Sequence, residues 1–298
     1  MDAETCLTDR FPPVPTEELV RLIAEFDAAD EDARAATIAH LVAHHPIIAH
    51  DWGQAARYRR ARVLDPGDSV DTVEELIWRK GQRQAPGRAN PEGFAVLYLA
   101  DRRDTALSEV RADDDDVVLS DFSIRPGQSV QVAPIGEWIQ AYRTGTAFLA
   151  PQDALKLTDS LAACPPQEAR AILMADAFLL DCLTSRDDDY VTSSQVALAL
   201  FGRHPTIDAI AYPSRRHLGG VCFAVRTERV WKKWGLFSAR RSRARHLAMG
   251  MYDLDRVLHV SGVTPEGRLH WSAEHDPRPN TAVQLDPLWI PHGEESEG

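Results

Sequence analysis

The stretch that decides the fold runs from Gly87 to Arg111 and reads GRANPEGFAVLYLADRRDTALSEVR. It opens with two glycines, a proline and an asparagine, residue types that are typical of turns. The sequence therefore predicts a loop that carries Arg88. The apolar run Phe94 to Ala100 follows, and it predicts a strand buried on both faces, with the hydroxyl of Tyr98 as its polar tip.

After this strand the period of the apolar residues changes to that of a helix. Asp104 or Thr105 can serve as its N-cap, and Glu109 is then expected one turn inside the helix. The cation of Arg88, the phenol of Tyr98 and this carboxylate thus lie on three consecutive elements. We expect such an arrangement to be able to converge on one pocket.

The length and charge of the chain limit what surrounds this stretch. With 298 residues, the chain has room for one catalytic-sized domain with extensions. A formal net charge of −12 disfavours nucleic acid and anionic lipid as general partners, although a local basic pocket is compatible with it.

Cysteine usage and hydropathy indicate the compartment. The cysteines are scattered without CxxC spacing, which argues against a zinc cage or a disulfide framework and fits a reducing cytoplasm. The acidic N-terminus lacks an apolar signal region, and no apolar run approaches the ~18 residues that span a bilayer. We therefore expect a cytoplasmic protein without a membrane partner. The four cysteines are Cys6, Cys164, Cys182 and Cys222.

Two helices are predicted near the N-terminus, one with Thr16 as its N-cap and a second from about Asp30 to His45. The second carries His40 and His44 at the helical spacing of zinc proteases. Leu41, however, stands where such a site has its glutamate, so a solvated helix face is the better interpretation and no metal site is predicted.

Two further strands carry chemistry. In Arg57–Leu64, RYRRARVL, alternation places Arg60 and Arg62 on one face, and an exposed edge strand with protective charges is the ordinary alternative. The strand Ile207–Tyr212 delivers Ser214 into the tight segment that follows it. No GxSxG motif surrounds this serine, so a hydrolase nucleophile is not expected.

The segment 231–245 interleaves basic and aromatic residues. Such a composition could contact nucleic acid or a partner, and a solvated amphipathic face explains it as well. Its aromatic members are Trp231, Trp234 and Phe237, and its basic members are Lys232, Lys233, Arg240, Arg241, Arg243 and Arg245.

The segments YRRARV, GRANPEGFAVLYLA, DTALSEVR and IDAIAYPSRR, in this order, resemble the RES domain, a family named for an arginine, a glutamate and a serine. The resemblance covers about Arg57 to Arg226. It implies an α+β fold similar to ADP-ribosyltransferase toxins, with a mixed or antiparallel sheet core, surrounding helices and, in this chain, an N-terminal helical extension. It also implies cleavage of the nicotinamide–ribose bond of NAD+. Many members are toxins of bacterial toxin–antitoxin pairs, silenced by an antitoxin with a helix-turn-helix domain.

Carried over by position, the family's glutamate falls on Glu109, its tyrosine on Tyr98, its serine on Ser214 and its loop arginine on Arg88. A carboxylate such as Glu109 would stabilise positive charge on the ribose, and Tyr98 would stack on nicotinamide. Ser214 would bond the ribose or the amide, and Arg88 would bind the pyrophosphate. NAD+ enters as substrate, and neither a metal nor a prosthetic group is required.

The family's earlier arginine falls within YRRAR, where Arg59, Arg60 and Arg62 are all candidates because the run can be slid by one residue. We choose Arg60, with Arg62 second, as pyrophosphate ligands. The chain departs from the family where many members have an asparagine after the glycine that follows the serine, because it has Gly219-Gly220-Val221-Cys222 instead. This departure concerns the details of NAD+ contacts there.

These patterns predict an arm and helical extension over 1–55, a catalytic domain over 56–228, and a C-terminal extension over 229–298 that packs on the core. The predicted function is NAD+ consumption by hydrolysis or phosphorolysis, in a toxin of a toxin–antitoxin pair. The alternatives are transfer of ADP-ribose to a protein and a non-catalytic binding module that uses segment 231–245. The expected partners are NAD+ and an antitoxin, and a homodimer is left open.

Overall fold

The computed structural model describes residues 6–54, 56–77, 86–91, 93–185, 190–272 and 284–291. The chain forms two compact units, each made of several segments. The first comprises Met1–His50, Ala85–Phe94 and Val132–Tyr212, and the second comprises Asp51–Gln84, Ala95–Gln131 and Pro213–Gly298. Strand β1 (His50–Trp52) lies where the chain first passes from one unit to the other.

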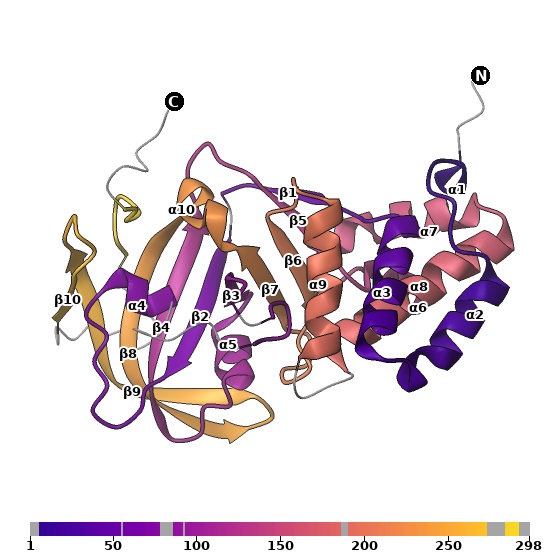
Figure 1. Cartoon of the computed structure of the whole chain (residues 1–298). Coiled ribbons are helices and arrows are strands. Elements are labelled where there is room, and N and C mark those ends of the chain that lie inside the picture. The colour runs from indigo at the N-terminus through magenta and orange to yellow at the C-terminus, as the bar shows by residue number, and fades with distance from the viewer. Residues whose placement is uncertain are drawn as a thin grey trace. The chain divides into compact units, whose positions relative to one another are not determined.

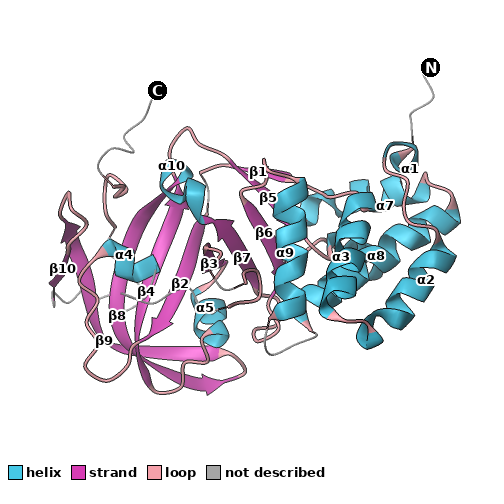
Figure 2. Cartoon of the chain, in the orientation of Figure 1, coloured by secondary structure: helices cyan, strands magenta, loops and turns pink. Residues whose placement is uncertain are grey.

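The first unit is mainly helical (Figure 2). Its strands are the last part of β5 (Val130–Pro134) and most of β6 (Ala209–Pro213), which run parallel with Val132 opposite Ala209. Its helices are α1 (Leu7–Arg10), α2 (Thr16–Glu25), the 3-10 turn η1 (Phe26–Ala28), α3 (Glu31–His44), α6 (Glu137–Thr144), the 3-10 turn η2 (Pro151–Asp153), α7 (Ala154–Ala162), α8 (Pro166–Thr184) and α9 (Val191–Arg203).

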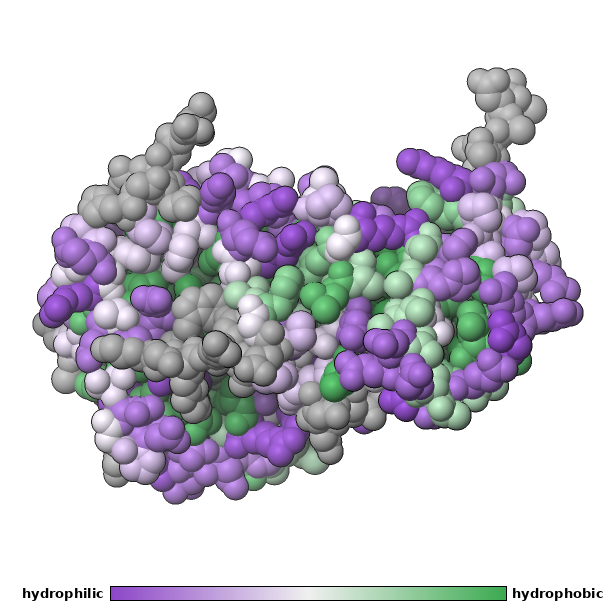
Figure 3. All heavy atoms as spheres, in the orientation of Figure 1, coloured by the Kyte–Doolittle hydropathy of each residue, from purple (hydrophilic) through white to green (hydrophobic). Residues whose placement is uncertain are grey.

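Helices α2 and α3 confirm the two predicted near the N-terminus, and hydrophilic side chains lie beside hydrophobic ones on the visible face of this part of the molecule (Figure 3). Asp30 is the N-cap of α3, and its carboxylate accepts a hydrogen bond from the amide of Ala33 at 2.8 Å. The predicted cap at Thr16 is wrong, because Pro15 is the N-cap of α2. The hydroxyl of Thr16 instead donates to the carbonyl of Gln167 at 3.2 Å.

The two histidines of α3 have protein partners. His44 Nδ1 bonds to the carbonyl of His40 at 2.9 Å, and His40 Nε2 lies 3.5 Å from Glu18 Oε1. Among the residues that the structure describes, no group of three or more histidine, cysteine or acidic side chains is placed to hold a metal ion.

A buried contact between His45 and Asp176 accompanies the start of α6 in the first unit. His45 Nε2 lies 3.3 Å from Asp176 Oδ1, and both side chains are almost fully buried. The same carboxylate accepts hydrogen bonds from the amides of Gly136 at 3.1 Å and Ile139 at 2.9 Å, at the start of α6. The otherwise unpaired amides of this helix end therefore have an anionic partner.

The second unit is built on an antiparallel sheet. Short helices accompany it, namely α4 (Val73–Ile77), α5 (Arg103–Glu109), the 3-10 turn η3 (Thr227–Arg229) and α10 (Val230–Lys233). Figure 1 shows the strands, which neighbour one another in the order β7 (Val221–Arg226), β3 (Val96–Ala100), β2 (Arg57–Val63), β4 (Asp115–Ile124), β8 (Trp234–Ala248), β9 (Met251–Val263) and β10 (Leu269–Ser272).

Strands β3 and β2 lie inside this sheet. In β3 all residues except Tyr98 are buried, which confirms the predicted strand with two covered faces. The interpretation of Arg57–Leu64 as an exposed edge strand is wrong, because β2 lies between β3 and β4. Its Tyr58 is 2% exposed and packs edge-on against the rings of Phe223 and Trp234.

Helix α5 covers one face of the sheet. Its Ala106 and Leu107 belong to one apolar cluster with Ala61 of β2 and Ala100 of β3. The helix confirms the predicted change of period, but its N-cap is Arg102 rather than Asp104 or Thr105. Glu109 is also not one turn inside the helix, because α5 ends at this residue.

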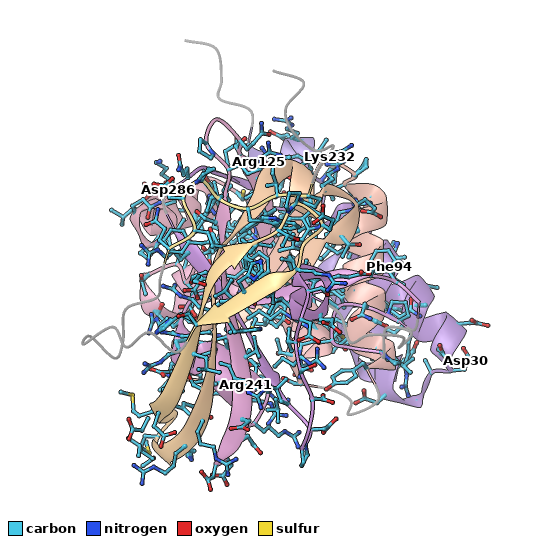
Figure 4. The ribbon with its side chains drawn as sticks, turned by 90° about the vertical axis from the view of Figure 1, so that its left-hand side faces the viewer. Asp30, Phe94, Arg125, Lys232, Arg241 and Asp286 are labelled. Atoms are coloured by element: carbon cyan, nitrogen blue, oxygen red, sulfur yellow. The ribbon has the colours of Figure 1, made fainter. Side chains whose placement is uncertain are left out.

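The basic aromatic segment 231–245 becomes the end of α10 and most of β8. Arg241, Arg243 and Arg245 pair with Asp116, Asp114 and Asp253 at 3.3, 3.0 and 3.1 Å, respectively. Figure 4 labels Arg241 on this strand, together with Arg125 and Lys232 near one end of the ribbon, where Arg125 donates to the Lys232 carbonyl at 3.2 Å. Trp234 and Phe237 are buried. Several of the charges and rings expected for a nucleic-acid surface thus have partners within the fold.

No helix in the described part of the chain is both long enough and apolar enough to cross a bilayer.

Candidate functional site

The site begins with a direct contact between the predicted serine and the predicted glutamate. Ser214 follows β6, and its Oγ donates to Glu109 Oε1 at 2.6 Å. The same oxygen accepts hydrogen bonds from the amides of Arg216 at 3.2 Å and His217 at 2.9 Å. Because a hydroxyl has one proton and two lone pairs, these contacts orient the proton of Ser214 toward the carboxylate.

A second bridge joins the same loop to the same helix. Thr105 Oγ1 donates to Asp101 Oδ1 at 3.0 Å and lies 2.8 Å from His217 Nδ1. Since its only proton goes to Asp101, Thr105 accepts from His217, which assigns the ring proton to Nδ1. Thr105 and Glu109 are four residues apart on α5 and therefore share a helix face. The loop from Ser214 to His217 is thus fixed to this face at two points.

Two glycines make room for the histidine. A Cβ on Gly220 would lie 2.5 Å from Thr105 Oγ1 and 3.1 Å from His217 Nδ1. A Cβ on Gly250 would lie 2.7 Å from His217 Cδ2. The Gly219-Gly220 sequence, which departs from the family pattern, therefore has a local reason at its second glycine: any side chain there would push Thr105 and His217 apart.

Cys222 adds a thiol to the Glu109 environment. It lies on β7 and is 4% exposed. Burial raises the pKa of the Cys222 thiol well above its ordinary value, and the charge of Glu109 and the hydrogen bond to it raise this pKa further. The group is consequently a neutral S–H donor near neutral pH, and it can share the Glu109 carboxylate with Ser214.

The strand register shows which side chains share the face of α5. Paired residues of antiparallel strands point to the same face, and the pairs Cys222–Ala100, Ala100–Arg59, Arg59–Asp121 and Asp121–Ser238 form one row across five strands. Ala100 belongs to the cluster beneath α5, so the row lies on that side. Tyr98, two residues from Ala100, lies on the same face and is half-buried.

This row carries its own charges. Arg59 donates to the carbonyl of Asp101 at 2.6 Å, and its Nε lies 3.7 Å from Asp121 Oδ1. The Asp121 carboxylate also accepts from Ser238 Oγ at 2.9 Å. Arg240 is 7% exposed, and burial lowers the pKa of its guanidinium while the charge of Asp121 raises it. Through its bond to the Asp101 carbonyl, the guanidinium of Arg59 is held two residues before the start of α5. The Arg59 side chain is half-buried.

Arg60 and Arg62 point to the opposite face of β2. Arg60 Nε donates to the carbonyl of Leu76 at 3.0 Å, and Arg62 Nη1 donates to the carbonyl of Glu75 at 2.9 Å. Both acceptors belong to α4. Alternation along the strand, which predicted that these two arginines share a face, is confirmed, but that face holds α4 and not Glu109.

Arg88 belongs to the first unit. Its Nη1 donates to the carbonyl of Leu183 at 2.9 Å, and its guanidinium carbon lies 5.9 Å from the ring centre of Tyr190. This contact anchors the loop that carries Arg88 to the end of α8. The structure thus brings Glu109 and Ser214 into contact, places Tyr98 on the sheet face that α5 covers, and gives Arg88 partners within its own unit.

The sequence analysis did not identify His217, Cys222 or the contacts of Thr105. It also preferred Arg60 to Arg59 as the pyrophosphate ligand. Spacing could have indicated two of them. Thr105 precedes Glu109 by one helical turn, and His217 follows Ser214 by three residues in a tight loop.

The comparison with protein families agrees with the resemblance. The family model of the RES domain matches residues 59–233. Among solved structures, the chain is similar to one from the crystal structure of the M. tuberculosis MbcT–MbcA toxin–antitoxin complex, with 16% sequence identity. That match covers 78% of this chain and 94% of the other, at a TM-score of 0.33, which is too low to bear an argument. No curated protein matches the chain.

Proposed function

The chain belongs to the RES domain family, and on that premise we propose that it is an enzyme that cleaves the nicotinamide–ribose bond of NAD+. The observation that carries the proposal is the 2.6 Å hydrogen bond from Ser214 to Glu109. It joins the family's serine and glutamate, which lie 105 residues apart in the sequence, on one side of the sheet. Such a carboxylate suits a reaction in which positive charge develops on a sugar.

The chemistry of the bond assigns the central role to Glu109. Nicotinamide leaves with the electron pair of the C–N bond, so the ribose becomes oxocarbenium-like, and a nearby carboxylate stabilises that state. Ser214 donates to one carboxylate oxygen and keeps the group oriented before the substrate binds. The neutral thiol of Cys222 adds a second donor. Glu109 itself is half-buried at the end of α5.

Substrate binding is assigned to the same face of the sheet. Arg59 offers a planar fork to the pyrophosphate, and it takes precedence over Arg60 and Arg62 because those two point to the opposite face of β2, where they bond to α4. Tyr98 supplies an aromatic ring for stacking on nicotinamide. Arg60, Arg62 and Arg88 stay alternative pyrophosphate ligands.

The acceptor defines the reaction class. In hydrolysis, water forms the new C–O bond, nicotinamide leaves as a neutral molecule, and one proton is released together with ADP-ribose. In phosphorolysis, a phosphate oxygen forms that bond and the product is a phosphorylated ADP-ribose. Transfer to a protein side chain is the second candidate, since the same ribosyl cation can be captured by any nucleophile that reaches it.

The experiment incubates the purified chain with NAD+ in the absence and presence of phosphate and follows free nicotinamide. Release in both buffers with ADP-ribose as product supports hydrolysis, and release that depends on phosphate supports phosphorolysis. NAD+ labelled in the adenine, followed on a protein gel, detects transfer to a protein. If no nicotinamide forms and no label is transferred, the enzymatic proposal is wrong.

A toxin role extends the proposal to the cell. Because NAD+ serves all of metabolism, the chain produced alone in the bacterial cytoplasm should slow growth and lower the NAD+ pool, and a helix-turn-helix antitoxin should reverse both. A strain that produces the Glu109→Gln variant at the same level is the control. Normal growth and a normal NAD+ pool with an enzyme that is active in vitro would contradict the toxin role for the chain on its own. Size-exclusion chromatography of the active enzyme tests the homodimer.

A further inference from the structure

Two cysteines of the first unit lie in contact, although 158 residues separate them. Cys6 is the N-cap of α1, and Cys164 follows α7 by two residues, just before Pro165. Their Sγ atoms are 3.1 Å apart. A disulfide bond measures about 2.05 Å, so the two sulfurs need approach by only ~1 Å to be joined. The other two cysteines, Cys182 in α8 and Cys222 in β7, are buried elsewhere.

The surroundings of the two thiols differ. Cys6 is partly exposed, and its Sγ lies 3.3 Å from the hydroxyl of Thr8. Cys164 is 6% exposed, and its Sγ donates to the carbonyl of Ser160 at 3.2 Å. A reagent from solvent therefore reaches the sulfur of Cys6 first, because the sulfur of Cys164 is buried.

Electrostatics assign the same roles. The hydrogen bonds that Cys6 makes with the side chains of Thr8 and Cys164 lower the pKa of its thiol, while the neighbouring Asp9 carboxylate acts in the opposite direction. Burial raises the pKa of the Cys164 thiol, and Cys6 raises it further. The thiolate, which is the reactive form, is thus favoured at the more exposed sulfur.

We propose that Cys6 and Cys164 are a redox-active dithiol that closes to a disulfide when it meets a small-molecule disulfide such as oxidised glutathione. In the first step, the Cys6 thiolate attacks one sulfur of the reagent, forms a mixed disulfide and expels one thiolate. In the second step, Cys164 loses its proton and attacks Cys6 Sγ, and the second thiol of the reagent leaves. The protein is oxidised by two electrons, and the reagent is reduced to two thiols.

The disulfide would tie the N-terminal segment to the turn between α7 and α8. In the reduced protein, the contacts between these segments include hydrogen bonds from Cys6 Sγ to the Ala163 carbonyl at 3.6 Å and to Cys164 Sγ. A covalent link that closes so long a loop restricts the unfolded chain strongly. The inference is independent of NAD+ cleavage, since neither cysteine belongs to the site around Glu109.

Tryptic peptides make the test direct. Cleavage after Arg10, Lys156, Arg170, Arg186, Arg216 and Arg226 places each cysteine in a separate peptide. The full-length folded protein is incubated with a graded series of oxidised and reduced glutathione, quenched in acid, alkylated and digested without reductant. We expect one linked species, peptide 1–10 joined to peptide 157–170, about 2 Da lighter than the sum of its two reduced parts. Cys182 and Cys222 should be recovered alkylated only after denaturation.

Stability gives a second readout. The oxidised wild-type protein should melt higher than the reduced one by on the order of 5 °C. Cys6→Ser and Cys164→Ser should each abolish both the linked species and this shift, and Cys164→Ser should accumulate glutathione on Cys6. If a variant does not fold, the wild-type peptide map still decides. A wild-type protein that keeps glutathione on Cys6 without forming the link, or that links another cysteine pair, would overturn the proposal.

Discussion

The two units treat a glutamate in opposite ways. In the first unit, Glu137 is fully buried, and its carboxylate accepts hydrogen bonds from the amides of Phe148, Leu149 and Ala150 at 2.9, 3.1 and 3.2 Å. In the second unit, Glu109 is half-buried at the end of α5 and meets the side chains of Ser214 and Cys222. Backbone amides fix a carboxylate permanently, whereas side-chain donors can turn away when a substrate enters. The first arrangement is typical of structure, and the second is suited to chemistry.

The largest effect is expected at Glu109. Glu109→Gln keeps the shape of the side chain and removes its charge, so NAD+ should still bind while turnover falls by ~10²–10³, or ~2.7–4 kcal/mol, by analogy with the loss of one preorganised stabilising group. Nicotinamide release, NAD+ affinity and melting curves of both proteins provide the measurement.

The matched control is Glu228→Gln, which removes the same charge from an exposed side chain of the same unit that pairs with Arg226 at 3.3 Å. Its rate and melting temperature should equal those of the wild type. If Glu109→Gln keeps more than about a tenth of the wild-type rate, Glu109 is not the centre of the reaction, and the contrast with Glu137 loses its meaning.

Glu137→Gln should act on stability and not on chemistry. The amide group cannot accept from all three backbone amides and brings its own N–H groups toward them, so the free energy of unfolding should fall by ~2 kcal/mol at neutral pH. Urea titration measures this value. The Michaelis constant for NAD+ should stay within twofold of the wild type, and a selective loss of turnover in a stably folded variant would contradict the structural role.

The difference in unfolding free energy between the wild type and Glu137→Gln should also depend on pH. Burial raises the pKa of Glu137 above its ordinary value in spite of the amides. As the pH falls through the folded-state pKa, the folded protein takes up a proton that the unfolded chain accepts only at lower pH, so this group favours folding more in that window. The stability advantage of the wild type over Glu137→Gln should therefore grow as the pH falls from neutral. An advantage that shrinks would mean that the charged form is favoured in the fold.

Arginines of the second unit extend the comparison to binding. Arg59→Ala should raise the Michaelis constant for NAD+ by ~10- to 100-fold, because a charge-assisted contact to pyrophosphate contributes ~1.5–3 kcal/mol. Arg59→Lys should lie between, since it keeps the charge and loses the fork. Arg60→Ala should mainly lower stability, because it removes the bond to Leu76 in α4. The reverse result would return the anchor to Arg60, and unchanged constants in both would move it to Arg88.

The sequence allowed much of this arrangement to be predicted where the information is local. The apolar run of β3, the change of period into α5 and the start of α3 near Asp30 are properties of neighbouring residues. Alternation showed that Arg60 and Arg62 share a face. It could not show which face meets α5, because that depends on the pairing of Arg59 with Ala100 across two strands.

The remaining errors also come from long-range partners. Strand β8 was not predicted because its arginines look solvated in the sequence, whereas aspartates of β9 and of the segment around the start of β4 neutralise several of them across the sheet. Thr105 looks like an N-cap, yet its hydroxyl is drawn to Asp101 and to His217, which lies 112 residues away. The domain limits at 55/56 and 228/229 stay predictions, as do the roles of the site residues.

The smallest effect is expected at His217, which is connected to Glu109 through Ser214 of the same loop. Its ring bonds to Thr105, and its amide to Ser214, so the loss of the ring should loosen the loop without removing the hydroxyl from Glu109. His217→Ala should lower turnover by ~10-fold or less, with little change in the Michaelis constant for NAD+. His217→Asn, whose amide N–H can still reach Thr105, should recover part of the loss. Because the two residues share one bond, Thr105→Val combined with His217→Ala should cost less than the sum of the single changes. Full additivity, or a loss confined to melting temperature, would show that this bridge supports the fold alone and that Ser214 orients the carboxylate without its help.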